Sequence, residues 1–275
     1  METFFATLWH GAMDLAPFAL IFAALAAITK RRGAIAAALR ARRETATNLG
    51  LFVLNKAIWL PILAIPLLAF QDVLQQVTPL AGLWTSLPKL ALVGIAVVVI
   101  DFGAYWRHRW EHSPELWRVH ATHHADEAMG WLTLHRKHPL GEALAAFLDL
   151  VPAILLGLPI WAIVTALVLR GWWGYLIHAD VPWTLGPLGK VMISPAAHRL
   201  HHIRDEALMG SNYGNTITLW DRLFGTYIDP APYLNCDTGI AEGTRGFVGE
   251  LVRPFEARYR RRSPAGALPA DQAAA

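Results

Sequence analysis

The sequence predicts an all-α integral membrane protein with about four transmembrane helices, two plus a hairpin. Of its 275 residues, 55% are hydrophobic and 16% are charged. The apolar residues gather in uncharged runs whose lengths approach the roughly 20 residues that a helix needs to cross a bilayer. A soluble domain of ordinary composition explains this pattern poorly.

Apolar runs place the candidate spans along the chain. The first covers about residues 15–29, the second about 49–70 and the third about 90–106. The apolar region 141–178 is too long for one crossing, and Gly157-Leu158-Pro159 interrupts it. We therefore expect a hairpin of two helices, each of about 18 residues.

We expect one membrane-embedded domain over residues 1–262, followed by a disordered tail at 263–275. The net charge is a modest +3, and the basic residues cluster beside apolar runs instead of forming a stripe that would bind nucleic acid. We therefore expect no nucleic-acid partner. A single cysteine, Cys236, excludes a thiolate zinc site of the CxxC type.

Orientation follows from the charges in the loops. Cytoplasmic loops are enriched in Lys and Arg, so the basic loop between the first two candidate spans is expected in the cytoplasm. Counting crossings from it places residue 108 in the cytoplasm, and the hairpin returns residues 178–202 to the same side. We expect the inner membrane of a bacterium, with this side facing the cytoplasm. The basic residues of the loop are Lys30, Arg31, Arg32, Arg40, Arg42 and Arg43.

Two charged residues, Asp149 and Arg170, lie within the apolar sequence of the hairpin. Charges inside membrane segments usually pair or serve a function. We expect these two residues to form an ion pair with each other, with placement at the surface as the alternative.

Histidines recur at fixed spacings. The pattern HxxxH occupies residues 108–112, and HxxHH occurs at 120–124 and again at 198–202. On a helix, residues three and four apart share a face, so the imidazoles of each box can converge. Imidazole binds zinc, copper, iron and nickel, and the number of histidines exceeds one tetrahedral zinc site. The boxes therefore predict two metal ions in a cytoplasmic helical cap. The candidate ligands are His108, His112, His120, His123, His124, His178, His198, His201 and His202.

Acidic residues near the boxes are candidates for orienting the imidazoles. Asp205 and Glu206 each lie four residues after a histidine of the last box. Asp101 lies within an apolar run on the same helical face as His108. We expect Asp101 to tune the first box through neighbouring groups, with a helix cap at the aqueous edge as the alternative.

The segments around the histidines resemble the fatty acid hydroxylase superfamily, also called the sterol desaturase family. DFGAYWRHRWEHSPELWRVHATHH is similar to that family's first two boxes, and HRLHHIRDEALMGSNYGNTITLWDRLFGTY is similar to its last box and the segment that follows. The matching region runs from about residue 99 to 227. By position, the eight box histidines match the family's ligands and His178 matches a less fixed one. His135 and His138, in LHRKHPLGE, need not bind metal.

This resemblance implies a membrane-bound, non-haem di-iron oxygenase. Such an enzyme holds two iron ions, takes dioxygen as co-substrate, and hydroxylates or desaturates a lipid substrate such as a fatty acyl chain or a sterol. No haem-carrier sequence of the His-Pro-Gly-Gly type is present. Electrons are therefore expected from a separate electron-transfer protein, ferredoxin-like or cytochrome-type, and its reductase.

Two other functions stay open. A membrane zinc hydrolase would use the same imidazoles but would need a glutamate base placed as in HExxH, which the boxes lack. A metal transporter or sensor would carry polar ligands within its spans, which here are mostly apolar. The sequence favours the oxygenase.

Overall fold

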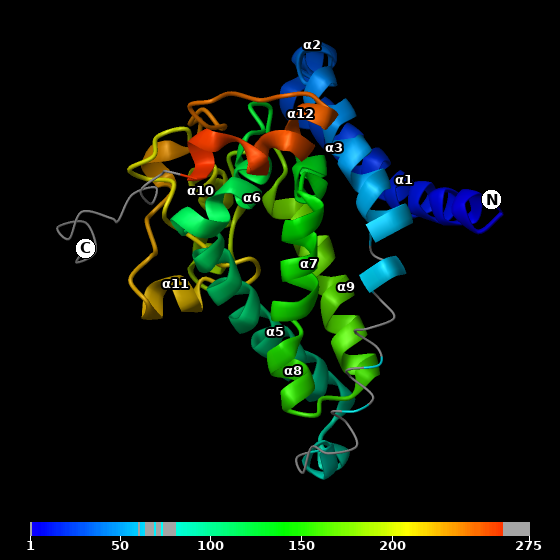
Figure 1. Ribbon diagram of the computed structural model, residues 1–275. Helices are drawn as coiled ribbons and strands as arrows, with labels where there is room; N and C mark the ends of the chain where they lie inside the picture. The colour runs from blue at the N-terminus through cyan, green and yellow to red at the C-terminus, as the bar shows by residue number, and fades with distance from the viewer. Residues whose placement is uncertain (1, 60, 64–68, 70–72, 74–80, 261–275) are drawn as a thin grey trace.

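The structure is a computed structural model that describes residues 2–59, 61–63, 69, 73 and 81–260. In Figure 1 a bundle of long helices stands below a cap of short helices and loops. Among the described residues, β-structure is limited to two isolated bridges, Met192 with Ile217 and Ile203 with Thr238. The predicted tail at 263–275 lies outside the described residues. So do residues 60, 64–68 and 70 of the second predicted span.

The described part of the chain is built mainly from α-helices. They are α1 (Glu2–Lys30), α2 (Ala34–Arg40), α3 (Arg42–Leu54), α5 (Lys89–Glu111), α6 (Pro114–His124), α7 (Pro139–Leu148), α8 (Val151–Leu155), α9 (Ile160–Ile177), α10 (Pro195–His201), α11 (Leu219–Leu223) and α12 (Phe247–Val252). Short helical turns between them include η2 (Asn55–Trp59) and η4 (Trp131–His135), and η7 (Arg253–Phe255) follows α12.

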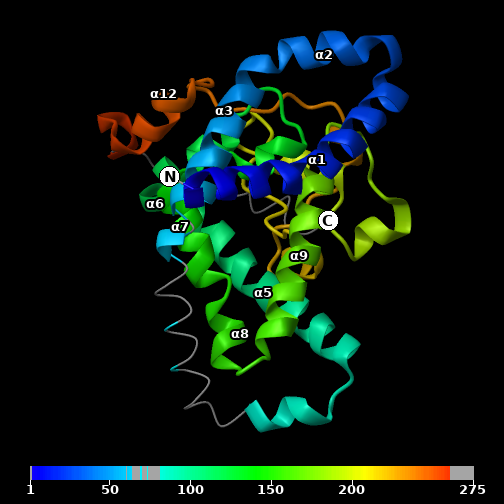
Figure 2. The ribbon, with the colours of Figure 1, turned by 90° about the vertical axis from the view of Figure 1, so that its right-hand side faces the viewer.

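Four helical stretches in the described part of the chain are long and apolar enough to cross a membrane. They are Trp9–Arg40, Arg42–Leu63, Lys89–Glu111 and Ile160–Ile177. The protein is therefore a multi-pass membrane protein, and the predicted all-α membrane fold is confirmed. Figures 1 and 2 both show α1 running across α9 instead of alongside it.

The chain reverses direction at Gly157-Leu158-Pro159, as the sequence predicted for the hairpin. α8 ends at Leu155 and α9 begins at Ile160, and Gly157 between them has a positive φ of 66°, a conformation that favours glycine. The first arm is not one helix of 18 residues, because it is divided into α7 and α8. Pro152 has no amide hydrogen and its ring clashes with the carbonyl four residues earlier, so α7 ends at Leu148.

Small residues let α5 pack closely against both arms of the hairpin. Ala96 of α5 is buried in one cluster with Ala162 and Ala166 of α9. A Cβ on Gly103 would lie 3.0 Å from the carbonyl oxygen of Leu148, so α5 and α7 approach at backbone distance. This packing holds the cap-side ends of α5 and α9 next to each other.

The expected ion pair between Asp149 and Arg170 is wrong. Asp149 instead lies 2.6 Å from Arg107 of α5, and Arg170 lies 3.3 Å from Asp101 of the same helix. Both arms of the hairpin pack on α5 more than on each other, so each charge pairs with α5.

Candidate metal centre

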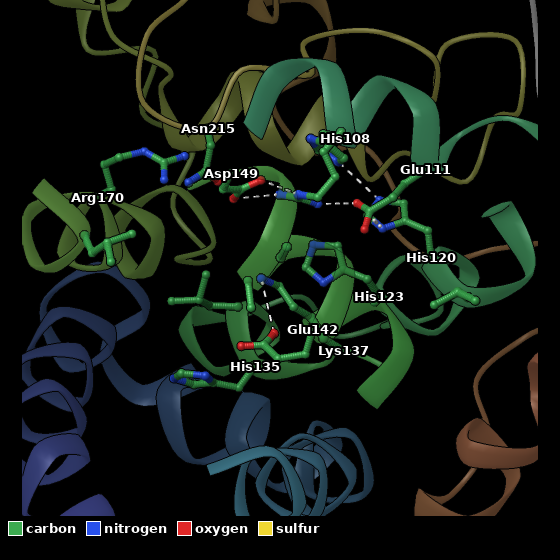
Figure 3. A pocket seen from close by; sticks show the side chains of 18 of the residues that line it. His108, Glu111, His120, His123, His135, Lys137, Glu142, Asp149, Arg170 and Asn215 are labelled. Carbon is green, nitrogen blue, oxygen red and sulfur yellow. Dashed lines mark hydrogen bonds and ion pairs between the residues drawn. The ribbon is translucent and has the colours of Figure 1, made fainter. Parts of the chain in front are cut away.

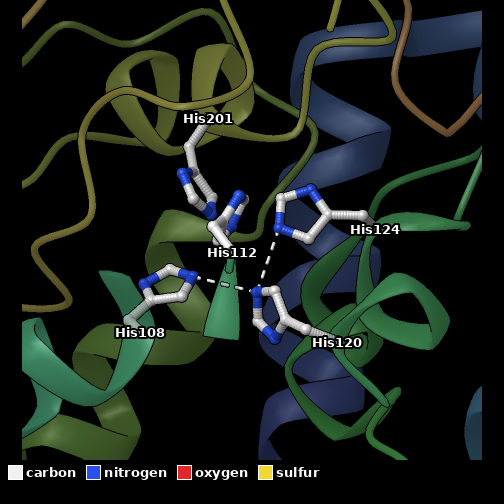
Figure 4. A group of neighbouring side chains, drawn as sticks. All are labelled: His108, His112, His120, His124 and His201. Carbon is white, nitrogen blue, oxygen red and sulfur yellow. Dashed lines mark hydrogen bonds between the residues drawn. The ribbon is translucent and has the colours of Figure 1, made fainter. Parts of the chain in front are cut away.

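The structure brings the nine predicted histidines together in two neighbouring clusters, and all nine are buried. Within each cluster the candidate ligand nitrogens lie within 4.8 Å of one another. The rings of His124 and His202, one from each cluster, stack with centroids 4.3 Å apart. The five-histidine cluster contains His108, His112, His120, His124 and His201 (Figure 4), and the four-histidine cluster contains His123, His178, His198 and His202.

Helix ends supply most of these side chains. His112 is the C-cap of α5, His178 the C-cap of α9 and His202 the C-cap of α10. On α6, His120 and His124 are one turn apart and join the five-histidine cluster, whereas His123 joins the other. One HxxHH box therefore serves both clusters.

Backbone carbonyls fix the orientation of four of the imidazoles. Because a carbonyl oxygen can only accept a hydrogen bond, each Nδ1 in these pairs must donate, and Nε2 is left free to bind a metal. The pairs are His108 with Tyr213 (2.8 Å), His201 with Ser211 (2.7 Å), His178 with Gly174 (2.7 Å) and His123 with Arg136 (3.2 Å).

A carboxylate acts in the same way on a fifth imidazole. The Nδ1 atom of His120 lies 3.2 Å from a carboxylate oxygen of Glu111. Nothing in the sequence pattern distinguished Glu111, although it directly precedes the second histidine of the first box. Arg107 in turn pairs with both Glu111 and Asp149.

These hydrogen bonds leave unprotonated nitrogens facing each other. The Nε2 atoms of His108 and His120 are 3.1 Å apart, and those of His123 and His178 are 3.4 Å apart. With both Nδ1 atoms of each pair donating elsewhere, two lone pairs are opposed and no hydrogen bond forms. Two nitrogens bound to one metal at about 2.1 Å would stand about 3.0–3.4 Å apart. The geometry of both clusters therefore fits a cation.

Other imidazole nitrogens are buried without a protein partner. Both nitrogens of His112 and both of His202 have none, nor does Nε2 of His201. Buried polar atoms are otherwise nearly always hydrogen-bonded. These nitrogens are therefore further candidate ligand atoms.

Burial keeps the imidazoles neutral, which is the form that binds metals. Loss of solvation lowers the pKa of His178 to about 3 and that of His201 to about 4. Burial and the neighbouring imidazoles hold the pKa of His123 and His202 well below 6.5.

The loop after the last box supplies two of the orienting carbonyls, those of Ser211 and Tyr213. Asn212 between them has a positive φ of 52°, and its side chain bonds the backbone of Ala197 and Ile228. The loop is therefore held in place on both sides.

Asp221 anchors the backbone of this loop. Its carboxylate accepts from the amides of Tyr213 (2.7 Å) and Gly214 (2.8 Å) and from the hydroxyl of Thr226 (2.7 Å). Burial raises the pKa of Asp221 to about 6. The segment that follows the last box thus shapes the backbone that orients His108.

Arg136, whose carbonyl orients His123, has a fully buried side chain. Its guanidinium donates to Glu44 (2.6 Å) and Asn48 (3.0 Å) of α3 and to Glu250 (2.9 Å) of α12. Sequence reasoning did not identify this residue, because its role depends on three segments that are distant in the chain.

Asp101 is buried and accepts from the amide of Ile217 (3.1 Å) as well as pairing with Arg170. It thereby anchors the far end of the loop that carries Tyr213. The expectation for Asp205 is wrong, because α10 ends at His201 and the exposed Asp205 accepts from the amide of Ala207. Glu206 is exposed as well.

The two histidines of LHRKHPLGE have other contacts. His135 bonds the hydroxyl of Tyr175 at 2.8 Å. His138 is the N-cap of α7, where its Nδ1 accepts from the amide of Leu140. Neither belongs to the two clusters.

A cavity of about 480 Å³ adjoins both clusters (Figure 3). It lies between α5, α6, α7 and α9, and His108, His120 and His123 line one side. Apolar residues such as Leu63, Leu150 and Leu167 line another part. The clusters therefore face a space large enough for part of a ligand.

Residues 93–226 match the family model described as fatty acid hydroxylase. The chain is 31% identical over 176 residues to ornithine lipid hydroxylase OlsE of Rhizobium tropici, a match that covers 63% of this chain and 53% of that protein. It is 32% identical over 133 residues to alkylglycerol monooxygenase of Homo sapiens, covering 48% of this chain and 29% of that protein.

A third relative is the Delta(7)-sterol 5(6)-desaturase of Gibberella zeae, 30% identical over 164 residues, with 59% of this chain and 44% of that protein covered. The chain thus spans about half or less of the length of these relatives. No solved structure matches the chain significantly.

Proposed function

Residues 93–226 belong to the fatty acid hydroxylase family, and from that premise we propose that the protein is a membrane-bound di-iron oxygenase. It would hydroxylate or desaturate a lipid substrate. The observation that carries the proposal is the pair of opposed Nε2 atoms in each cluster, which a bound cation explains. The relatives, named a hydroxylase, a monooxygenase and a desaturase, support an oxidative reaction.

In this proposal the five-histidine cluster holds one iron ion and the four-histidine cluster holds the other. Iron, when bound, would supply the activation of dioxygen as co-substrate. A separate electron-transfer protein, ferredoxin-like or cytochrome-type, and its reductase would deliver the electrons. The residues of the chain position the imidazoles, keep them neutral and shield them from water.

The cavity is the proposed lipid site. His108, His120 and His123 line it together with apolar side chains, so a lipid in it would lie beside both clusters. Because α5 and α9 are candidate membrane spans, a lipid could enter the cavity from the bilayer without crossing water.

We place the clusters on the cytoplasmic side of a bacterial inner membrane. The basic residues from Lys30 to Arg43 lie at the end of α1, on η1 (Arg31–Gly33), on α2 and at the start of α3. Figure 1 shows α2 at the same end of the molecule as the cap helices α6 and α10. The positive-inside bias therefore supports a cytoplasmic cap.

The test is metal analysis and lipid analysis of the purified protein and two variants. We expect about two iron ions per chain, and a lipid that gains one oxygen atom or one double bond when the protein, dioxygen and a reductant are present. His123→Ala should lower bound iron and abolish turnover. His10→Ala is the matched control, because His10 is exposed and lies outside both clusters. About one zinc ion and no iron would overturn the proposal in favour of a hydrolase.

A further inference from the structure

The cavity beside the histidine clusters has charged walls. Its charged lining residues are Arg107, Glu111, Lys137, Glu142, Asp149 and Arg170. Arg170 is engaged by Asp101. The others include two ion pairs that place both signs of charge on the cavity wall, Arg107 with Asp149 at 2.6 Å and Lys137 with Glu142 at 3.6 Å.

Several of these charges lie beside the histidines. Glu111 contacts His120 directly, and Arg107, one turn earlier on α5, directly precedes His108. Asp149 meets Arg107 at this level. Lys137 and Glu142 flank the cavity near His135, as Figure 3 shows.

The apolar end lies farther along the spans. Leu167 precedes His178 by eleven residues, which is roughly 16 Å along α9. Its side chain is 37% exposed on a helix that is a candidate span. A hydrocarbon chain is therefore best accommodated at this end, next to the bilayer.

An alkyl chain placed against the charged walls would take these ion pairs out of water and return no hydrogen bonds to them. A polar headgroup with both donors and acceptors would satisfy them. The charged wall therefore favours the headgroup of a lipid over its hydrocarbon chain.

We propose, building on the proposed function, that the substrate is a membrane lipid with a zwitterionic headgroup held by Arg107, Asp149, Lys137 and Glu142. Its hydrocarbon tail extends past Leu167. The oxidised carbon lies in or next to the headgroup, because Glu111 contacts His120 and Arg107 directly precedes His108, so the charged wall stands beside the histidines.

The overall reaction balances with one dioxygen, two electrons from the electron-transfer protein and two protons. In hydroxylation a C–H bond breaks, one oxygen atom forms the new hydroxyl, and the other oxygen atom leaves as water. In desaturation two C–H bonds break, a double bond forms, and both oxygen atoms leave as water.

Binding can be tested without turnover, by titration calorimetry of the purified metal-loaded protein in detergent. The probes are palmitoyl lysophosphatidylethanolamine, which is zwitterionic, and hexadecanol, which has a chain of the same length. We expect the zwitterionic probe to bind at least tenfold more tightly, and equal affinities would overturn the proposal.

Two variants sharpen this comparison. Glu142→Gln and Lys137→Met should each reduce the preference for the zwitterionic probe at least threefold. Glu127→Gln is the matched control, because Glu127 pairs with Arg204 on the surface at 2.9 Å, away from this cavity. A preference that the two cavity variants leave unchanged would contradict the assignment of these side chains.

The position of oxidation is tested with ¹⁸O₂ and vesicles of a bacterial total lipid extract, using tandem mass spectrometry of the lipids. We expect label, or a new double bond, in the headgroup, the backbone or the first few carbons. Oxidation in the middle of a chain would overturn this inference and leave the proposed function standing. Lipids without any oxidation would overturn the proposed function, on which this inference rests.

Discussion

The Nδ1 atom of His123 lies 3.2 Å from the carbonyl oxygen of Arg136, and the side chain of Arg136 has no exposed surface. The same guanidinium bonds Glu44 of α3 and Glu250 of α12. One residue thus joins two distant parts of the chain to an imidazole of the four-histidine cluster.

Arg136→Met should remove metal from the four-histidine cluster and destabilise the fold. Removing the guanidinium leaves the buried carboxylate of Glu44 without its cation, whereas Glu250 keeps Arg253 at 2.6 Å. Removing one partner of a buried ion pair typically costs about 3–5 kcal/mol. Arg136→Lys keeps the charge but loses the forked geometry, so we expect a smaller loss of both metal and stability. The measurements are metal content per chain and the midpoint of thermal unfolding.

Arg245→Met is the control for this prediction, because Arg245 pairs with Glu256 nearer the surface. It should retain both metal ions. Full metal content in Arg136→Met would show that the contact with His123 has no part in metal binding.

Asp221→Asn should weaken metal binding at the five-histidine cluster. An amide can accept on only one of its two atoms, so its NH₂ group would face either the amide of Gly214 or that of Tyr213. The displaced loop would move the carbonyl that orients His108. We expect metal loss in dialysis at least threefold faster than in the unmodified protein, and an unchanged rate would contradict the link.

The sequence predicted the convergence of the histidine boxes because that convergence depends on local spacing. HxxHH places its imidazoles on one helical face, and the turn at Gly157 returns the chain so that His178 and the last box reach the first two. Both features are local, and both are visible in the order of the residues.

The sequence failed where a contact depends on the rotation of one helix against another. Asp149 and Arg170 lie on opposite arms of the hairpin, yet both face α5, whose charges are their partners. Asp205 was assigned by helical spacing, but α10 ends at His201. The carbonyls of Ser211, Tyr213 and other orienting residues leave no signal in side-chain identity.

Acid should destabilise the metal-free protein. The folded-state pKa is about 3 for His178 and about 4 for His201, against 6.5 in the unfolded chain. Both pKa values are lowered on folding, so the unfolded chain binds more protons below pH 6.5 and folding stability falls as the pH drops. Between pH 7 and pH 5 each histidine should cost about 2 kcal/mol.

Thermal unfolding of the metal-free protein at the two pH values tests this prediction. His178→Gln should show a smaller dependence on pH, because one of the two groups is gone. Equal or greater stability at pH 5 would contradict the prediction.

Reporters fused to truncated chains should place the cap on one side of the membrane. A reporter fused at Trp84 should be found outside, whereas reporters fused at Asp126 and Asp229 should both be found in the cytoplasm. The order follows from the basic residues near α2 and from the hairpin formed by α7, α8 and α9. If the reporters at Asp126 and Asp229 were found on opposite sides of the membrane, the histidines before and after the hairpin could not form common clusters.

The bonds of Arg136 to Glu44 and Glu250 also set an order of events during biosynthesis. The chain is made from its N-terminus, so α3, the histidine boxes and the membrane hairpin all precede α12. Until Glu250 has been synthesised, Arg136 lacks one of its two buried carboxylate partners, and the carbonyl facing His123 is not yet fixed. The four-histidine cluster therefore reaches its final geometry only after translation has passed α12.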